Sequence, residues 1–290
     1  MTDSNRPDQI EPANPQVNAP GKRWFVRFTP EQRMMHAVLF STFLGLAATG
    51  LPLRFSESIW ARGMASAVGG FGAILAFHKL CAVVLTLAFL LHVKEVFQRG
   101  LFRRERGIFW GPNSMVANLK DAGDLVAHMR WFVGLGPRPK FDRFAYWEKF
   151  DYWAVFWGMI VIGFSGYAMW FAPFFAHILP GWALNAVLVI HSEEGLLAIL
   201  FIFSIHFVNT HLRPDSFPMD MVIFTGVETE EELKHKHPLE YERLKKEGKL
   251  EKRLGEAPHI WQVHFSRIVG TIAIAIGLTL LVLTLTAYFS

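Results

Sequence analysis

The sequence predicts an all-α membrane protein, in which a four-helix transmembrane bundle is followed by a fifth, C-terminal transmembrane helix. Of 290 residues, 52% are hydrophobic and 14% aromatic, while 19% are charged, a mixture that indicates apolar spans separated by charged aqueous segments. Lys and Arg are also distributed unevenly between those segments. Five apolar stretches reach the roughly 20 helical residues that cross a bilayer core, and they lie near residues 34–54, 71–97, 152–172, 184–209 and 263–288.

The segments between these stretches define the domain organisation. Residues 1–33 are polar, rich in proline and without an apolar core, so we predict a disordered cytoplasmic N-terminal segment rather than a signal peptide. Residues 34–209 form the four-span bundle, which includes a cytoplasmic loop at 98–150. Residues 210–262 form a charged cytoplasmic tail, and residues 263–290 form the fifth transmembrane helix.

Lys and Arg set the predicted orientation. The N-terminal segment up to Arg33 carries five of them, segment 94–149 eleven and segment 210–267 ten, whereas the first loop carries two and loop 173–183 none. The positive-inside rule therefore places the N-terminus, the long loop and the tail in the cytoplasm, and the C-terminus outside. We expect a multi-pass protein of a prokaryotic cytoplasmic (inner) membrane.

Two cytoplasmic segments are predicted to contain further helices. The stretch SMVANLKDAGDLVAHMRWF alternates apolar and polar residues near the helical period, so it lies along the membrane surface or packs against the tail. The tail, at about 226–254, is charged and favours helix, and we interpret it as a cap on the inner end of the bundle. His235 and His237 are two residues apart and fall on different helix faces, which predicts surface groups rather than metal ligands.

Five of the twelve histidines lie inside the first, second and fourth apolar stretches: His36, His78, His92, His191 and His206. An ionisable ring in a membrane span is costly, and it therefore indicates function. His92 follows His78 by fourteen residues and His206 follows His191 by fifteen, so each pair is separated by about 21–22 Å along one helix and returns to within about 60° of the same face. With the predicted orientation, His78 and His191 form an outer layer, while His206 forms an inner layer with His36 or His92.

Two layers of paired histidines favour two haem groups as the bound cofactors. A low-spin haem iron takes two axial ligands from opposite sides, for which neutral imidazole is suited, and the apolar macrocycle fits between the helices of a bundle. Small residues must leave room for it; Gly195, one turn after His191, is a candidate, although ordinary helix packing explains such glycines equally well. Cys81 is the only cysteine, which excludes a c-type attachment motif and a four-cysteine iron–sulfur site.

Four segments resemble the gamma subunit of membrane-bound formate dehydrogenases, a di-haem cytochrome b, and the related cytochrome b subunits of prokaryotic hydrogenases and thiosulfate reductases. The segments are RMMHAVLFSTFLGLAATG around His36, FHKLCAVV around His78, VIHSEEGLLAILFIFSIH around His191 and His206, and KHKHPLEYERL in the tail. The resemblance covers about residues 27–250, and it depends on the order of these segments together with the topology.

The resemblance implies that His78 and His191 hold the outer haem, and that His36 and His206 hold the inner one. It also implies that electrons pass between a catalytic partner outside and quinone near the inner haem. The chain departs from the family in a longer His191–His206 interval and in its fifth span. His92 has no ligand counterpart there, so it is a rival inner ligand or a residue of the quinone site.

Several polar residues near these histidines have two interpretations. Arg33 lies one turn before His36, where it pairs with an inner haem propionate or anchors the span at the interface. Lys79 and Arg62 are the corresponding outer candidates. His211 lies near the membrane exit and is expected to be solvated, with a ligand role in a third haem as the weaker alternative.

The sequence thus predicts the di-haem b subunit of a respiratory oxidoreductase, which transfers electrons between an external redox partner and the quinone pool. Substrate chemistry then belongs to a partner subunit that carries iron–sulfur clusters or multihaem cytochrome c, and we expect no nucleic-acid partner. One alternative is a stand-alone quinol-oxidising cytochrome b that reduces a small external acceptor. Another, of a different class, is a transporter whose membrane histidines bind or relay a cation or a proton.

Overall fold

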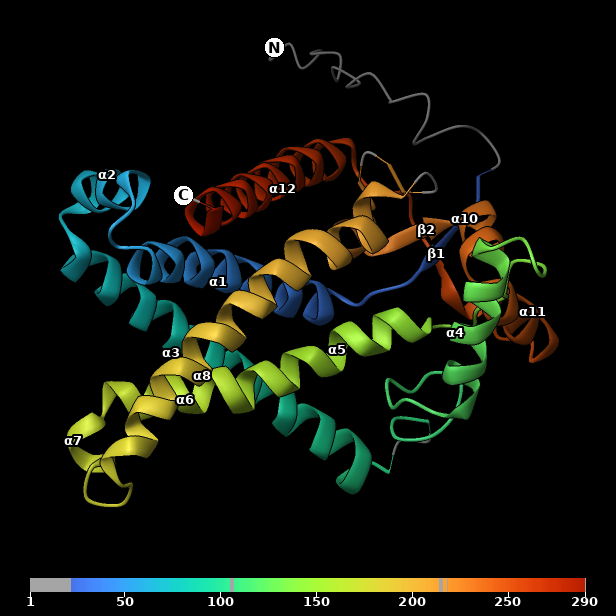
Figure 1. Ribbon diagram of the computed structural model, residues 1–290. Helices are drawn as coiled ribbons and strands as arrows, with labels where there is room; N and C mark the ends of the chain where they lie inside the picture. The colour runs from blue at the N-terminus through green and yellow to red at the C-terminus, as the bar shows by residue number, and fades with distance from the viewer. Residues whose placement is uncertain (1–21, 105–106, 214–215, 218, 290) are drawn as a thin grey trace, which may run out of the picture.

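Five long helices, together with a small three-stranded sheet, make up the computed structural model, which describes residues 22–104, 107–213, 216–217 and 219–289 (Figure 1). Among these residues, five helices are long and apolar enough to cross a membrane. The prediction of a mostly helical protein with five spans is therefore confirmed. The spans are 30–54, 71–102, 146–170, 181–212 and 260–289.

The spans are built from several labelled helices. The first is α1 (Pro30–Arg54), and the second is α3 (Phe71–Phe97) continued by the π-helix η1 (Gln98–Phe102). The third and fourth spans contain π-helical turns, and the fifth is one helix. The third span consists of α5 (Tyr146–Gly158), η2 (Met159–Gly163) and α6 (Phe164–Trp170). The fourth span consists of α8 (Gly181–Phe201), η3 (Ile202–His206) and η4 (Val208–Leu212). The fifth span is α12 (Ile260–Phe289).

Local sequence explains where the first two spans begin. Thr29 caps α1 in a capping box: its hydroxyl accepts from the Gln32 backbone N–H at 3.4 Å, and the Gln32 side chain accepts from the Thr29 N–H at 3.0 Å, which satisfies amides that the helix leaves unpaired. Between α2 (Ile59–Val68) and α3, Gly69 and Gly70 have φ of 98° and 99°. Glycine adopts this backbone conformation at little cost, so the chain reverses there.

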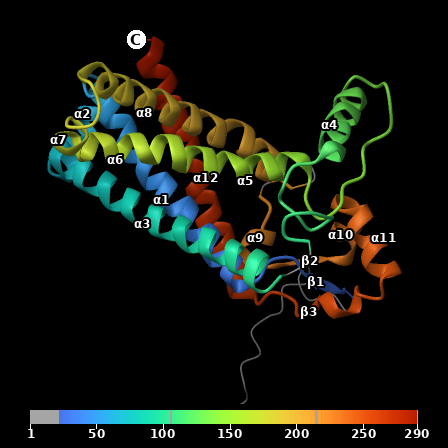
Figure 2. The same ribbon diagram turned by 90° about the horizontal axis from the view of Figure 1, so that it is seen from below.

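The two ends of the bundle differ in structure. At one end, α2 and α7 (Ala172–Phe175) form short connections between spans; we call this the α2 end (Figure 1). At the other end, the sheet and the remaining short helices gather beyond the ends of the spans (Figure 2). We call this the sheet end. Its helices are α4 (Leu119–Phe132), α9 (Val222–Thr225), α10 (Glu230–Lys236), α11 (Pro238–Lys246) and η5 (Glu251–Arg253).

The sheet corrects one sequence prediction. Its strand order is β2-β1-β3, and β1 (Trp24–Val26) pairs antiparallel with both β2 (Val227–Thr229) and β3 (Leu254–Gly255). Residues 22–33, predicted to be disordered, are therefore ordered, while residues 1–21 lie outside the described residues. The prediction was wrong because both partner strands come from the tail, about 200 residues later in the chain, and no local pattern reports them. Phe25, 1% exposed, packs there against Leu233, Leu244 and Leu250.

A buried network of charged side chains joins this sheet to the tail and the long loop. Glu240 is 1% exposed and accepts hydrogen bonds from Arg27 and Arg143, the latter at 3.0 Å. Arg143 also donates to the backbone carbonyl of Arg27 at 2.7 Å. His237 is buried beside them, and its Nδ1 lies 2.8 Å from the carbonyl of Asp142. The prediction of a surface group is therefore wrong for His237, while His235 is exposed as predicted.

Helix α4 has the reverse of the usual amphipathic arrangement. Its buried residues are Asp121 and His128; Asp121 accepts from Lys149 of α5 at 2.9 Å. Its exposed residues include Leu119, Val126 and Met129, which are 93%, 59% and 55% exposed. The helix thus packs on the start of the third span with its polar face and leaves its apolar face uncovered. Whether lipid covers that face stays a prediction.

The fifth span packs on the first and the fourth. Leu280 of α12 joins a buried cluster with Leu51 of α1 and with Phe203 of the fourth span. Gly277 makes the close approach to that span, because a Cβ at this position would lie 2.7 Å from Phe207 and 2.8 Å from Phe203. Helix α12 is therefore an integral part of the bundle.

Candidate functional site

A single continuous cavity runs through the bundle. Its volume is about 2250 Å³, and it extends from Arg54 and Lys79 at the α2 end to Arg27 and Glu228 at the sheet end. The five histidines singled out from the sequence all line it, and so does His211. Ordinary small-molecule pockets measure about 300–1,000 Å³, so this cavity has room for more than one large ligand.

His78 and His191 face each other across the cavity near the α2 end. His78 belongs to α3 and His191 to α8, and their ring centres are 6.3 Å apart with an angle of 77° between the ring planes. The tertiary structure therefore brings together the two residues that the sequence predicted to form a pair. We call them the first histidine pair.

Both rings of the first pair are held through Nδ1. His78 Nδ1 lies 2.8 Å from the Thr49 hydroxyl, which donates its own proton to the Gly45 carbonyl at 2.6 Å and so accepts from the ring. His191 Nδ1 lies 2.9 Å from the carbonyl of Ile162, a residue of the π-helical turn η2. These acceptors assign the ring proton to Nδ1 in each case. They leave Nε2 of each ring as the nitrogen able to bind a metal.

The spacing of the first pair matches two imidazoles on opposite sides of one metal ion. With metal–nitrogen bonds of about 2.0–2.1 Å and roughly 1.1 Å from nitrogen to ring centre, two such rings have centres about 6.3 Å apart. Among the described residues, no group of three or more His, Cys, Asp or Glu side chains could hold a metal ion. The first pair therefore presents two imidazoles and no larger cluster of such side chains among the described residues.

Glycines make the space around this pair. A Cβ at Gly50 would lie 3.2 Å from Cε1 of His78, and a Cβ at Gly166 would lie 2.9 Å from Cε1 of His191. Gly195 also lines the cavity, and a Cβ there would meet nothing within 4 Å. Gly50 and Gly166 thus accommodate the rings themselves, whereas Gly195 borders open space, as a bulky planar ligand beside His191 requires.

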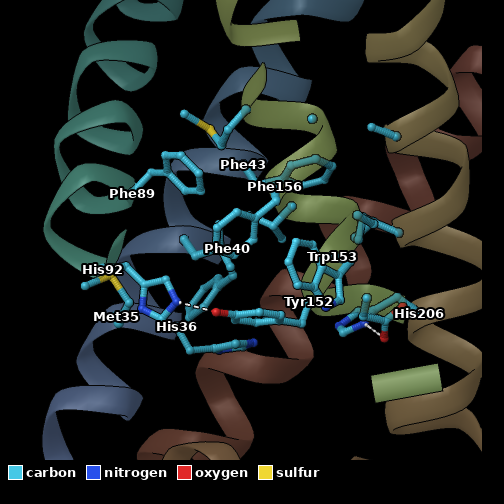
Figure 3. A pocket seen from close by; sticks show the side chains of 18 of the residues that line it. Met35, His36, Phe40, Phe43, Phe89, His92, Tyr152, Trp153, Phe156 and His206 are labelled. Carbon is cyan, nitrogen blue, oxygen red and sulfur yellow. Dashed lines mark hydrogen bonds and ion pairs between the residues drawn. The ribbon is translucent and has the colours of Figure 1, made fainter. Parts of the chain in front are cut away.

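The other three histidines lie toward the sheet end (Figure 3). His206 belongs to η3, and its Nδ1 lies 2.9 Å from the Asp151 carboxylate. His92 Nε2 lies 3.0 Å from the Tyr152 hydroxyl. Figure 3 shows His36 and His92 on one side of the view and His206 on the other, with aromatic side chains around and between them. We call His36, His92 and His206 the second histidine group.

His36 and His92 differ in the contacts that their rings make. The Nε2 of His92 is hydrogen-bonded to Tyr152, and Phe156 packs on the same ring at 6.2 Å between centres. The ring of His36 packs on Phe40, with 5.9 Å between the ring centres. Of the two predicted rivals for the partner of His206, His36 therefore has the less encumbered ring.

His211 lies deeper than predicted. Its Nδ1 is buried and has no hydrogen-bond partner among the described residues, while the residue as a whole is half-buried, so the ring is less solvated than predicted. Its ring centre is 6.4 Å from that of His206, a distance similar to that of the first pair. Both residues belong to the same helical span, five positions apart, so a broad macrocycle between them would collide with their own backbone.

Basic residues occur at both ends of the cavity. At the α2 end, Arg54 hydrogen-bonds to Ser192 and to Glu193, the latter at 2.8 Å, while Lys79 lies over the Trp170 ring at 4.8 Å. Arg62 is not among the described residues that line the cavity, and it lies 3.8 Å from exposed Glu57. The sequence prediction had not singled out Arg54.

Arg33, for which the sequence left two roles open, lies near the start of α1. It is not among the described residues that line the cavity. Its side chain packs closely on Gly226, because a Cβ at that glycine would lie 3.0 Å from Cδ of Arg33. The interpretation of Arg33 as an anchor at the end of the span therefore fits better. Several other arginines line the cavity toward the sheet end, among them Arg27 and Arg143.

Sequence reasoning missed the residues that hold the rings. Thr49, Ile162 and Asp151 lie 29, 29 and 55 positions from the histidines they contact. Asp151 carried one usable signal, because an acidic residue at the start of an apolar span is costly unless it is paired. No known protein-family model matches the chain, and no curated protein matches it either. The chain is a helical protein with five candidate membrane spans and a histidine-lined cavity.

Proposed function

We propose that this chain is the di-haem b membrane subunit of a respiratory oxidoreductase, and that it transfers electrons between an external redox partner and the quinone pool. One observation carries the proposal. His78 and His191, on different helices, hold their rings 6.3 Å apart, and Nδ1 of each ring contacts an oxygen of another helix. This is the donor set of a bis-imidazole haem site.

The first histidine pair would hold the outer haem. Thr49 and Ile162 fix the orientation of the two imidazoles, as outer-shell hydrogen bonds do for metal ligands. Gly195 leaves space for the macrocycle beside His191. Arg54 and Lys79 line the same end of the cavity and supply positive charge for the propionates.

The second histidine group would hold the inner haem through His36 and His206. We prefer His36 to His92 because Tyr152 occupies Nε2 of His92. His92 and Tyr152 together then offer a hydrogen-bonding pair to a quinone oxygen, between aromatic side chains that suit a flat apolar head group (Figure 3). The buried charges of Arg27, Glu240 and Arg143 lie beyond this group, toward the sheet.

Haem supplies one-electron transfer when bound. The chain itself contributes the axial nitrogens, an apolar wall that excludes water, and two histidine layers at different depths. Substrate chemistry would belong to a partner subunit with iron–sulfur clusters or multihaem cytochrome c, on the side of the α2 end. The excess of Lys and Arg at the sheet end makes that end cytoplasmic in the proposed orientation.

Difference spectra of the purified full chain test the proposal. We expect reduced-minus-oxidised bands of bis-imidazole b-type haem, together with loss of the outer centre in His78→Ala and in His191→Ala while the inner centre remains. His235→Ala, at an exposed histidine, is the matched control and should keep both centres. A colourless protein expressed with ample porphyrin, or variants that retain both centres, would refute the assignment.

A further inference from the structure

The histidines that the proposed function uses do not all have the same kind of partner at Nδ1. His78 donates to a hydroxyl and His191 to a backbone carbonyl, and both acceptors are neutral. His206 instead contacts the carboxylate of Asp151, at 2.9 Å. The sequence gives no reason for this difference, since all three rings lie in apolar spans.

The contact between Asp151 and His206 is largely buried. The side chains of His206 and Asp151 are 22% and 15% exposed, and both residues line the cavity. Within the part of the chain that the structure describes, no Lys or Arg forms an ion pair with Asp151, and His206 is its recorded partner. The negative charge of the carboxylate therefore acts directly on the imidazole at Nδ1.

A carboxylate at Nδ1 changes the metal-binding nitrogen of the same ring. It holds the proton on Nδ1, fixes the ring orientation and raises the basicity of Nε2. A more basic ligand stabilises the more positive oxidation state of a bound metal, so it lowers the reduction potential. Neutral acceptors such as those of His78 and His191 have a weaker effect, because hydrogen bonds to charged groups are stronger.

We propose that Asp151 is a positioning residue that lowers the reduction potential of the inner haem through His206. The inference depends on the proposed function, since it concerns a haem ligand. The inference adds to the proposed function by attributing a difference in reduction potential between the two haem centres to the Asp151 carboxylate. A purely structural ion pair would hold η3 against α5 equally well but would leave the potential unchanged.

Asp151→Asn in the full-length chain, purified in detergent, tests this assignment. The asparagine keeps an acceptor oxygen but removes the charge. In a redox titration followed by haem absorbance, we expect the inner centre to become at least tenfold easier to reduce, which is an upward shift of about 59 mV for a one-electron couple. The outer centre should not move.

Glu194→Gln is the matched control. Glu194 is another carboxylate that lines the cavity, but its recorded partner is the Trp157 indole, at 3.3 Å, and not a histidine. Its loss should leave the inner potential where it is. The electron paramagnetic resonance spectrum supplies a second readout, because the g values of the oxidised inner haem should change in Asp151→Asn and stay unchanged in Glu194→Gln.

The outcomes separate this inference from the proposed function. If the wild type has no bis-imidazole spectrum, the proposed function itself fails. If two centres titrate and Asp151→Asn leaves the inner potential and g values unchanged, only the role of Asp151 is overturned. If Asp151→Asn loses the inner haem, Asp151→Glu keeps the charge at an altered distance. A shifted inner potential in that variant supports the assignment, and an unchanged one overturns it.

Discussion

At the scale of single residues, the site depends on what surrounds each imidazole more than on the imidazoles alone. Thr49 and Ile162 accept hydrogen bonds from His78 and His191, and Gly166 leaves the space into which the His191 ring fits. A ring held at one nitrogen by a backbone carbonyl has little freedom to move aside. Even a small group added next to such a ring should therefore displace it.

Gly166→Ala tests this constraint. The new methyl would lie 2.9 Å from Cε1 and 3.3 Å from Nδ1 of His191, so the ring must leave its bond to Ile162. We expect the purified variant to lose most of the outer haem and keep the inner one, as measured by haem content per chain. Gly163→Ala is the control, because its Cβ would meet only the end of Met159 at 3.9 Å. Full haem content with an unchanged spectrum in Gly166→Ala would contradict the proposed role of this glycine.

At the scale of elements, α4 is the helix whose surroundings remain incomplete. Its polar face is bound to the third span through Asp121 and Lys149, and its apolar face is open. The helix runs roughly across the direction of the spans in both views (Figures 1 and 2). Apolar side chains on a surface helix beside the ends of membrane spans favour the lipid interface, which is one of the two alternatives that the sequence left open.

A spin label at position 126 tests whether α4 lies in lipid. We expect a nitroxide on Val126→Cys, in a Cys81→Ala background and in nanodiscs of phosphatidylcholine and phosphatidylglycerol, to collide more with oxygen than with a water-soluble nickel complex. The same label at exposed Glu242 of α11 should show the opposite preference. Equal, water-like accessibility at both positions would place α4 in the aqueous phase.

At the scale of the whole molecule, the bundle and the sheet end form one structure that closes the cavity toward the sheet. The sheet places β1 between two strands of the tail, and it buries charges that line the cavity. Burial raises the pKa of Glu228 to about 7, although Arg27 acts in the opposite direction. Burial also lowers the pKa of His237, with the charge of Arg27 acting in the same direction. The stability of this end should therefore depend on pH.

Glu228→Gln tests how Glu228 contributes to the pH dependence of stability at the sheet end. The pKa of Glu228 is higher in the folded chain, about 7 against an ordinary value of 4.5, so its stabilising contribution is present at low pH and is lost as pH rises through about 7. Glutamine imitates the protonated form at every pH. We expect hydrogen exchange of the β1 amides to show Glu228→Gln gaining stability relative to wild type between pH 5 and 8. Parallel profiles would contradict the raised pKa. The other charged groups that act on Glu228 are Glu240, Lys236 and Asp220.

The sequence by itself determined the five spans and the placing of histidines at two depths on single helix faces. Hydropathy and the helical period are local properties, so Phe71–Phe97 and Ile260–Phe289 could be located without any tertiary information. The predictions of disorder for residues 22–33 and of a surface position for His237 were wrong because distant partners decide both. Only the tertiary structure decided which groups hold each ring and which nitrogen remains for a ligand. Those contacts join residues 29 to 60 positions apart, and hydrogen bonds at such separations leave no periodic pattern in the chain.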